Sequence, residues 1–189
     1  MPLTPFHYPV AYLLKRADQR LSLPALAVGS VMPDIEVPLM WVLFPGFPYD
    51  HLLLHSIVGA MTLGLTAAVF ATVFIYPQLV AFMFGLDREA IAEECQISRI
   101  LVVSALIGLL SHLLLDVTMH WYNPLLWPWV EPEALVGPLV LLLAFDGDIQ
   151  VTGFTLARVL VHGIMLLLFV AILARERGDG IWRRLWVTG

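Results

Sequence analysis

Histidines and acids recur in this sequence at intervals of four residues. His51 and His55 enclose a Leu-Leu-Leu run, and a second Leu-Leu-Leu run separates His112 from Asp116, with His120 four positions further on. Residues at i and i+4 share one face of an α-helix, so the spacing predicts that each set directs its side chains to one place. A mixed set of imidazoles and carboxylates favours zinc, with manganese or iron as alternatives, over magnesium or calcium.

Further polar residues extend this set beyond what one ion needs. His7 lies near the start of the chain, and Asp34 and Glu36 follow an apolar segment. Either two metal ions are bound, or some of the side chains orient the ligands or act as a general base. The predicted metal ligands are His7, Asp34, His51, His55, His112 and Asp116. The predicted catalytic or orienting residues are Glu36, His120 and Asp116. His162 is isolated in an apolar segment and is interpreted as a core histidine.

The composition places these residues in a membrane protein. Of the 189 residues, 60% are apolar and 13% are charged, and the mean hydropathy is +0.86. Soluble domains are nearer half apolar and a quarter charged. The net charge of -5 offers no basic surface for nucleic acid. The single cysteine, Cys95, excludes both an intramolecular disulfide and a thiolate metal cluster.

Three uncharged runs form the centres of predicted membrane helices, since a span needs roughly 20 mainly apolar residues. They cover residues 52–86, 100–115 and 159–174. We expect the first run to break near Pro77, because proline interrupts a helix. The main transmembrane helices are therefore predicted at residues 52–76, 99–121 and 154–174.

Shorter apolar segments complete the predicted fold. Residues 3–14 and 21–32 are each too short to span, so residues 1–34 are expected to form a helical hairpin that brings His7 near Asp34. Residues 134–145 are predicted to form a short re-entrant or interfacial helix, and residues 175–189 an interfacial tail. The fold class is thus all-α, a polytopic helical membrane protein with one domain over residues 1–189.

The basic residues predict the orientation, because they favour the cytoplasmic side in short loops. Apart from Arg158, they group at residues 15–20, 88–99 and 175–184, whereas residues 35–51 and 121–151 contain neither Lys nor Arg. The second set of connections is therefore expected to lie outside. Most candidate ligands fall at the outer ends of their helices, and His112 and His162 could meet about 12 Å deeper. The site is predicted on the extracytoplasmic side of a plasma or inner membrane.

Four motifs carry a family resemblance over about the first 130 residues. They are Met-Pro-Leu-Thr-Pro-Phe-His ending at His7, Gly-Ser-Val-Met-Pro-Asp ending at Asp34, the His51 to Ser56 segment, and the His112 to Trp121 segment. Together they resemble the YdjM-type inner-membrane metal-dependent hydrolases and related small membrane proteins. The His112-x-x-x-Asp116 element is also similar to that of helical zinc-dependent phospholipases C, which implies a phosphoester substrate. The chain departs from the family pattern at Glu36, where Asp is usual, and at Leu52, where Arg is common.

These observations predict a membrane hydrolase. A divalent metal, zinc for preference and one or two ions, would activate a water that attacks a lipid or amphipathic ester at the outer interface. Membrane lipids are the expected partners, and the oligomeric state stays open. One alternative is a divalent-cation or proton transporter or channel, because histidines and acids inside a membrane also build ion pathways. Another is a membrane binding protein with a structural metal.

Overall fold

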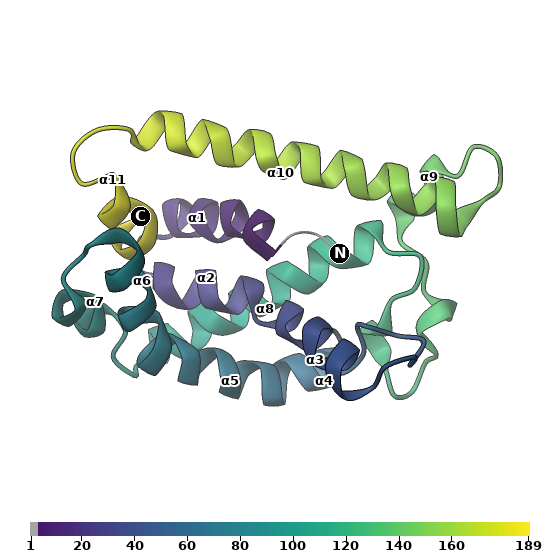
Figure 1. The fold of residues 1–189 in the computed structure, drawn as a ribbon, viewed down its shortest axis with the longest axis horizontal. Coiled ribbons are helices and arrows are strands. Elements are labelled where there is room, and N and C mark those ends of the chain that lie inside the picture. Colours follow the sequence, from purple (N-terminus) through teal and green to yellow (C-terminus); the bar gives the residue numbers. More distant parts are fainter. Residues whose placement is uncertain (1–3) are drawn as a thin grey trace.

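A computed structural model describes residues 4–189, and every regular element within them is helical (Figure 1). The predicted all-α fold class is therefore confirmed. Residues 1–3 of the predicted N-terminal hairpin lie outside the described residues. The α-helices are α1 (Tyr8–Ala17), α2 (Leu23–Val31), α3 (Glu36–Leu43), α4 (Ile57–Gly59), α5 (Leu65–Phe70), α6 (Tyr76–Phe84), α7 (Arg88–Glu94), α8 (Arg99–Met119), α9 (Pro138–Leu143), α10 (Phe154–Glu176) and α11 (Ile181–Arg183).

Short 3-10 and π turns join several of these elements into longer helices. Among the described residues, four such helices are long and apolar enough to cross a membrane. Their bounds are Leu23–Leu43, Ile57–Phe84, Arg99–Met119 and Ile149–Glu176. α8 and α10 cover most of the segments expected at residues 99–121 and 154–174, and α9 lies within residues 134–145.

The N-terminal region differs from the predicted hairpin. α1 packs against α2 as expected, but the second helix does not end near Met32. It continues through the 3-10 turn Pro33–Ile35 into α3 and reaches Leu43, which makes it a candidate span of 21 residues. Pro33 begins the 3-10 turn, where its missing N–H and its fixed φ are tolerated. The prediction that this segment is too short to span is wrong, because the proline does not end the helix.

The next helix also differs from its prediction. It begins at Ile57, where the Ser56 hydroxyl accepts a hydrogen bond from Gly59 N at 3.0 Å. His51 and His55 therefore lie in the preceding turns, and the prediction that they share a helix face is wrong. The helix also does not break at Pro77. A π turn at Ala71–Ile75 precedes α6, the chain stays helical to Phe84, and the ribbon changes direction between α5 and α6 (Figure 1).

The C-terminal tail folds back onto the helices. The Tyr8 hydroxyl donates a hydrogen bond to the Leu185 carbonyl, and the Tyr76 hydroxyl donates one to the Trp186 carbonyl. Arg184 also forms an ion pair with Glu176, with 3.0 Å between Nε and Oε2. The residues expected to form an interfacial tail are thus attached to α1, α6 and the end of α10.

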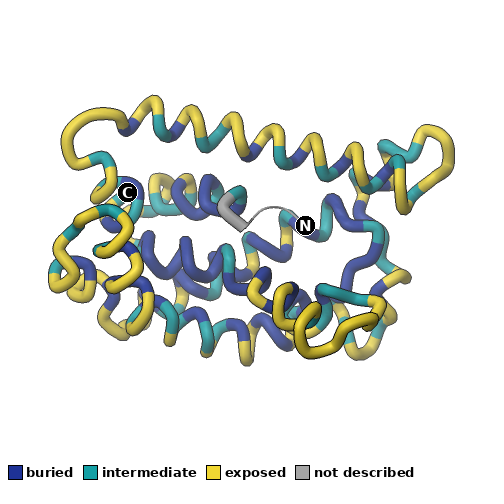
Figure 2. The backbone as a smooth tube through the Cα atoms, in the orientation of Figure 1, coloured by how far each residue is buried: buried dark blue, intermediate teal, exposed yellow. Residues whose placement is uncertain are grey.

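Burial is uneven among the helices. Figure 2 shows buried positions concentrated on α1, α2 and α8, whereas α10 is exposed along most of its length. Most of its exposed side chains are apolar, and Leu167 is 71% exposed. Such a surface suits hydrocarbon in place of water. The interior of the protein is therefore formed mainly by α1, α2 and α8.

α2 and α8 cross with their backbones in contact (Figure 1). A Cβ atom added at Gly29 would lie 2.3 Å from the Ala105 carbonyl oxygen, and one at Gly108 would lie 2.4 Å from the Leu26 carbonyl oxygen. Small residues allow this approach, as is common between membrane helices. The crossing matters for the site, because residues of both helices contribute to it.

This contact leads to a first prediction. Gly108→Ala forces α2 and α8 apart, and we expect it to destabilise the protein by about 1–3 kcal/mol, as overpacking of a core does. Gly163→Ala on α10 is the matched control, because an added Cβ there meets nothing within 4 Å. Thermal unfolding of both variants in the same detergent measures the difference. Equal melting temperatures for the two variants would contradict the observed crossing.

Candidate metal centre

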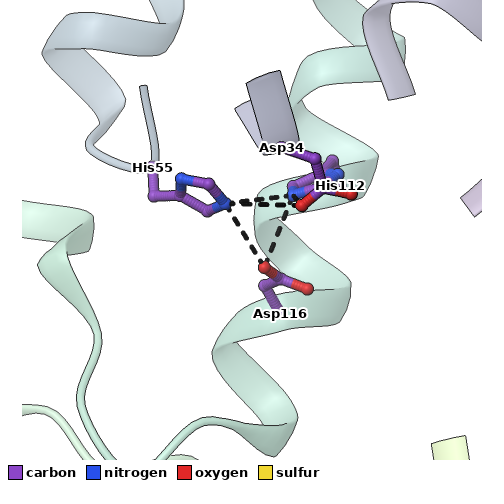
Figure 3. A group of neighbouring side chains, drawn as sticks. All are labelled: Asp34, His55, His112 and Asp116. Carbon is purple, nitrogen blue, oxygen red and sulfur yellow. Dashed lines mark hydrogen bonds and ion pairs between the residues drawn. The ribbon is translucent and has the colours of Figure 1, made fainter. Parts of the chain in front are cut away.

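Four buried side chains from three parts of the chain converge at one point (Figure 3). Asp34 lies in the 3-10 turn that follows α2, and His55 lies in the turn before α4. His112 and Asp116 lie one helical turn apart on α8. All four residues are at most 4% exposed. We call these four residues the first group.

Five of the six distances between ligand atoms in the first group are close to those of a tetrahedral ligand set. His112 Nε2 lies 3.3 Å from His55 Nε2, 3.4 Å from Asp116 Oδ2 and 3.6 Å from Asp34 Oδ1. His55 Nε2 lies 3.6 Å from Asp116 Oδ2 and 3.9 Å from Asp34 Oδ1. Ligands about 2.0–2.1 Å from a tetrahedral ion are separated by about 3.3–3.4 Å. The donor atoms therefore already have nearly the spacing that a zinc ion requires.

Hydrogen bonds on the opposite side of each imidazole determine which nitrogen faces the centre. His112 Nδ1 donates to the Ser30 carbonyl at 2.8 Å, and His55 Nδ1 donates to Glu36 Oε2 at 3.0 Å. Since these acceptors place the proton on Nδ1, both Nε2 atoms present lone pairs to the centre. Two nitrogen lone pairs and two carboxylates facing one another repel unless a cation lies between them. The first group is thus able to hold a metal ion.

A second group adjoins the first through Asp116. His51, Asp116 and His120 each offer a ligand atom, and these atoms lie within 4.8 Å of one another. His7 stands beside this group, with its Nε2 3.7 Å from Asp116 Oδ1 and its ring stacked on His112 at 3.9 Å between centroids. The structure therefore brings all six predicted metal ligands into or beside two adjoining groups.

The residues predicted as catalytic or orienting have distinct positions. Glu36 turns away from the centre. Its carboxylate accepts hydrogen bonds from the backbone N–H groups of Leu53 and Leu54 and from His55 Nδ1. It therefore orients His55 and holds the turn that carries it. His120 lies just beyond the end of α8, and its Nδ1 donates to the Asp116 carbonyl at 3.0 Å. Its Nε2 is buried and, within residues 4–189, has no hydrogen-bond partner.

Sequence reasoning missed Asp50 and the role of Tyr122. Asp50 Oδ1 accepts hydrogen bonds from His51 Nδ1 and from the Tyr122 hydroxyl, both at 2.6 Å. Burial opposes the charge on Asp50, but these hydrogen bonds hold the pKa of its carboxyl below the usual range. Burial and the bond to Asp50 raise the pKa of Tyr122, so the phenol keeps its proton. The adjacency of Asp50 to His51 was the available sequence signal.

Burial also favours the metal-binding form of His55 and His120. It lowers the pKa of His55 and the pKa of His120. Both imidazoles are therefore neutral at pH 7, which is the form that binds a metal.

His162 does not meet His112. Its ring packs edge-on against Phe6 at 5.4 Å between centroids, and its Nδ1 faces the Arg158 carbonyl. Neither of the two groups found among the described residues includes it. The expectation of a deeper meeting of the two histidines is wrong, because His112 turns instead toward Asp34 and His55.

A small cavity adjoins both groups. Its volume is about 10 Å³, close to the space that one water molecule needs. It is lined by His51, His55, Leu113, Asp116, Val117, His120, Tyr122, Asn123, Pro124 and Leu125. The site therefore has room for a small reactant beside its ligand atoms.

The fold and the site together define a helical membrane protein with a buried His and Asp cluster able to hold a metal ion. The family model described as YdjM inner membrane protein matches residues 7–178. The chain therefore belongs to the YdjM inner membrane protein family, and the resemblance noted in the sequence is confirmed. No curated protein and no solved structure matches the chain.

The position of Glu36 leads to a second prediction. Glu36→Gln keeps the size of the side chain but removes the charge that orients His55, and we expect zinc affinity to fall about 10–100-fold. Glu131→Gln is the matched control, because Glu131 is exposed. Competition with a chelating dye measures both affinities. An unchanged affinity in Glu36→Gln would show that His55 needs no orienting carboxylate.

Proposed function

We propose that this protein is a membrane-embedded metal-dependent hydrolase that cleaves a phosphoester of a lipid or another amphipathic substrate. The observation that carries the proposal is the buried convergence of two imidazole lone pairs and two carboxylates at tetrahedral spacing. Mixed nitrogen and oxygen donors favour zinc. A bound zinc ion would lower the pKa of a water molecule to about 7 and polarise a phosphoryl oxygen.

The chain's own residues would prepare this chemistry. Asp34, His55, His112 and Asp116 would hold the ion, while Glu36 and the Ser30 carbonyl fix the two imidazoles. Pre-oriented ligands do not need to reorganise during the reaction. The adjoining cavity would admit one water molecule. Tyr122 lines that cavity, and its hydroxyl donates a hydrogen bond to Asp50, so it would help to hold Asp50 and His51 in place.

The surroundings of the centre suit an amphipathic substrate. Trp41, Phe44 and Trp129 are 63%, 57% and 76% exposed, and they lie on the segments that lead into and out of the site. Aromatic side chains favour the interface between membrane and water. Lys15 and Arg16 end α1, and Arg99 begins α8, so these cations lie at the ends remote from the centre. With basic residues inside, the centre would face the outer interface.

The distribution of buried polar groups favours a hydrolase over a transporter. In the part of the chain that the structure describes, Glu176 is buried at the basic end itself, where it pairs with Arg184, whereas Thr72 and Ser104 are buried between the centre and that end and bond to backbone groups. Neither hydroxyl titrates or carries a charge, so they offer no relay for a proton or a cation. An ion pathway would need such groups through the whole membrane.

Hydrolysis by purified protein tests this proposal. We expect release of phosphate or a phosphorylated headgroup from detergent-solubilised phospholipids or isoprenoid phosphates, and loss of the activity with a chelator. His112→Ala and Asp116→Ala should reduce the rate to the chelator-treated background. His162→Ala is the control, since it removes a histidine outside both groups.

Two results would overturn the proposal. One is wild-type protein, purified without chelators, that contains no stoichiometric metal. The other is hydrolysis that persists unchanged in the chelator and in both variants, because the proposed centre would then take no part in the reaction.

A further inference from the structure

The first group leaves several buried polar atoms near it without hydrogen bonds. Within the described residues, His7 Nε2, His51 Nε2, His120 Nε2 and both carboxylate oxygens of Asp116 have no hydrogen-bond partner. All four residues are at most 5% exposed. A buried polar atom without a partner costs free energy, and such atoms are rare in folded proteins. Their occurrence together at one place therefore points to a ligand.

We propose that His51, Asp116 and His120 hold a second metal ion, with His7 beside them, and that Asp116 bridges the two metal positions. The inference rests on the proposed function, since it adds a metal position to the same site. It also sharpens the reaction class, because paired metal ions stabilise both the attacking and the leaving oxygen of a phosphoester.

The hydrogen bonds around His51 and His120 support this assignment. His51 Nδ1 donates to Asp50 at 2.6 Å, and His120 Nδ1 donates to the Asp116 carbonyl at 3.0 Å. Both Nε2 atoms therefore carry lone pairs. The arrangement matches that of the first group, in which a carboxylate orients one imidazole and a backbone carbonyl orients the other. Metal-binding histidines characteristically have such partners.

The carboxylate of Asp116 is placed to serve both positions. Its Oδ2 lies 3.4 Å from His112 Nε2 and 3.6 Å from His55 Nε2, in the first group. Its Oδ1 lies 3.7 Å from His7 Nε2, beside the second group. Oδ2 also lies 3.9 Å from His120 Nδ1, so the carboxylate lies between the imidazoles of both groups. The two negative oxygens would be shared between two cations, which offsets the cost of burying the charge.

The small cavity gives the second position an open side. His51, Asp116 and His120 all line it, together with His55 from the first group. A metal ion with an open coordination position can bind water or substrate, whereas a structural zinc ion is enclosed by its four ligands. The second position is therefore suited to take part in the reaction.

Zinc content measured on tag-free protein tests this inference, because a histidine tag would itself bind zinc. We expect two zinc ions per chain in the wild type and one in His51→Ala and in His120→Ala. His112→Ala should lose the zinc ion of the first group, and Asp116→Ala should weaken binding at both positions. His162→Ala should keep both ions. Size-exclusion chromatography and thermal unfolding verify that each variant is folded.

The outcomes separate this inference from the proposed function. One zinc ion in the wild type, retained in His120→Ala and lost in His112→Ala, would overturn the second position and leave the first intact. Two ions retained in both His51→Ala and His120→Ala would overturn the assignment of these ligands. No zinc in the wild type would overturn both proposals. If the alanine variants do not fold, zinc is titrated into metal-stripped wild-type protein instead. We expect two binding steps, and a single step would contradict the second position.

Discussion

The burial of carboxylates and imidazoles within an apolar helical bundle is the constraint on which the rest of this structure depends. Asp34 and Asp116 are at most 4% exposed, and the imidazoles of His55 and His112 face them with lone pairs. An uncompensated carboxylate is costly to bury in any protein and more so at membrane depth. A bound cation would remove this cost and would couple the stability of the helix ends that meet here to metal binding.

The fold around the centre fixes the donors in place. The backbone contact of α2 with α8 at Gly29 and Gly108 brings the Ser30 carbonyl within reach of His112. Glu36 positions the turn before α4, because it accepts hydrogen bonds from two backbone N–H groups of that turn. The same carboxylate orients His55. A helix crossing and a carboxylate thus hold the ligands, and the long exposed face of α10 is left to contact lipid.

Much of the site could be predicted, although part of it for the wrong reason. His112 and Asp116 do share a helix face, as their spacing indicates. His51 and His55 have the same spacing, but the next helix begins only at Ile57, with Ser56 as its N-cap. The two histidines therefore reach the site from turns. The extent of the second helix was mispredicted because the apolar run was bounded at residues 21–32, whereas the 3-10 turn carries the helix on to Leu43.

The sequence by itself determined that this chain is a helical membrane protein and which residue types could bind a metal. Composition and periodicity report hydrophobicity and contacts within one helix, and those properties are local. Only the tertiary structure decided how the donors are grouped, because His55 meets His112 across 57 residues and Ser30 meets His112 across 82. It also decided which nitrogen of each imidazole faces the centre, since the sequence does not indicate which backbone carbonyl accepts a hydrogen bond from an imidazole.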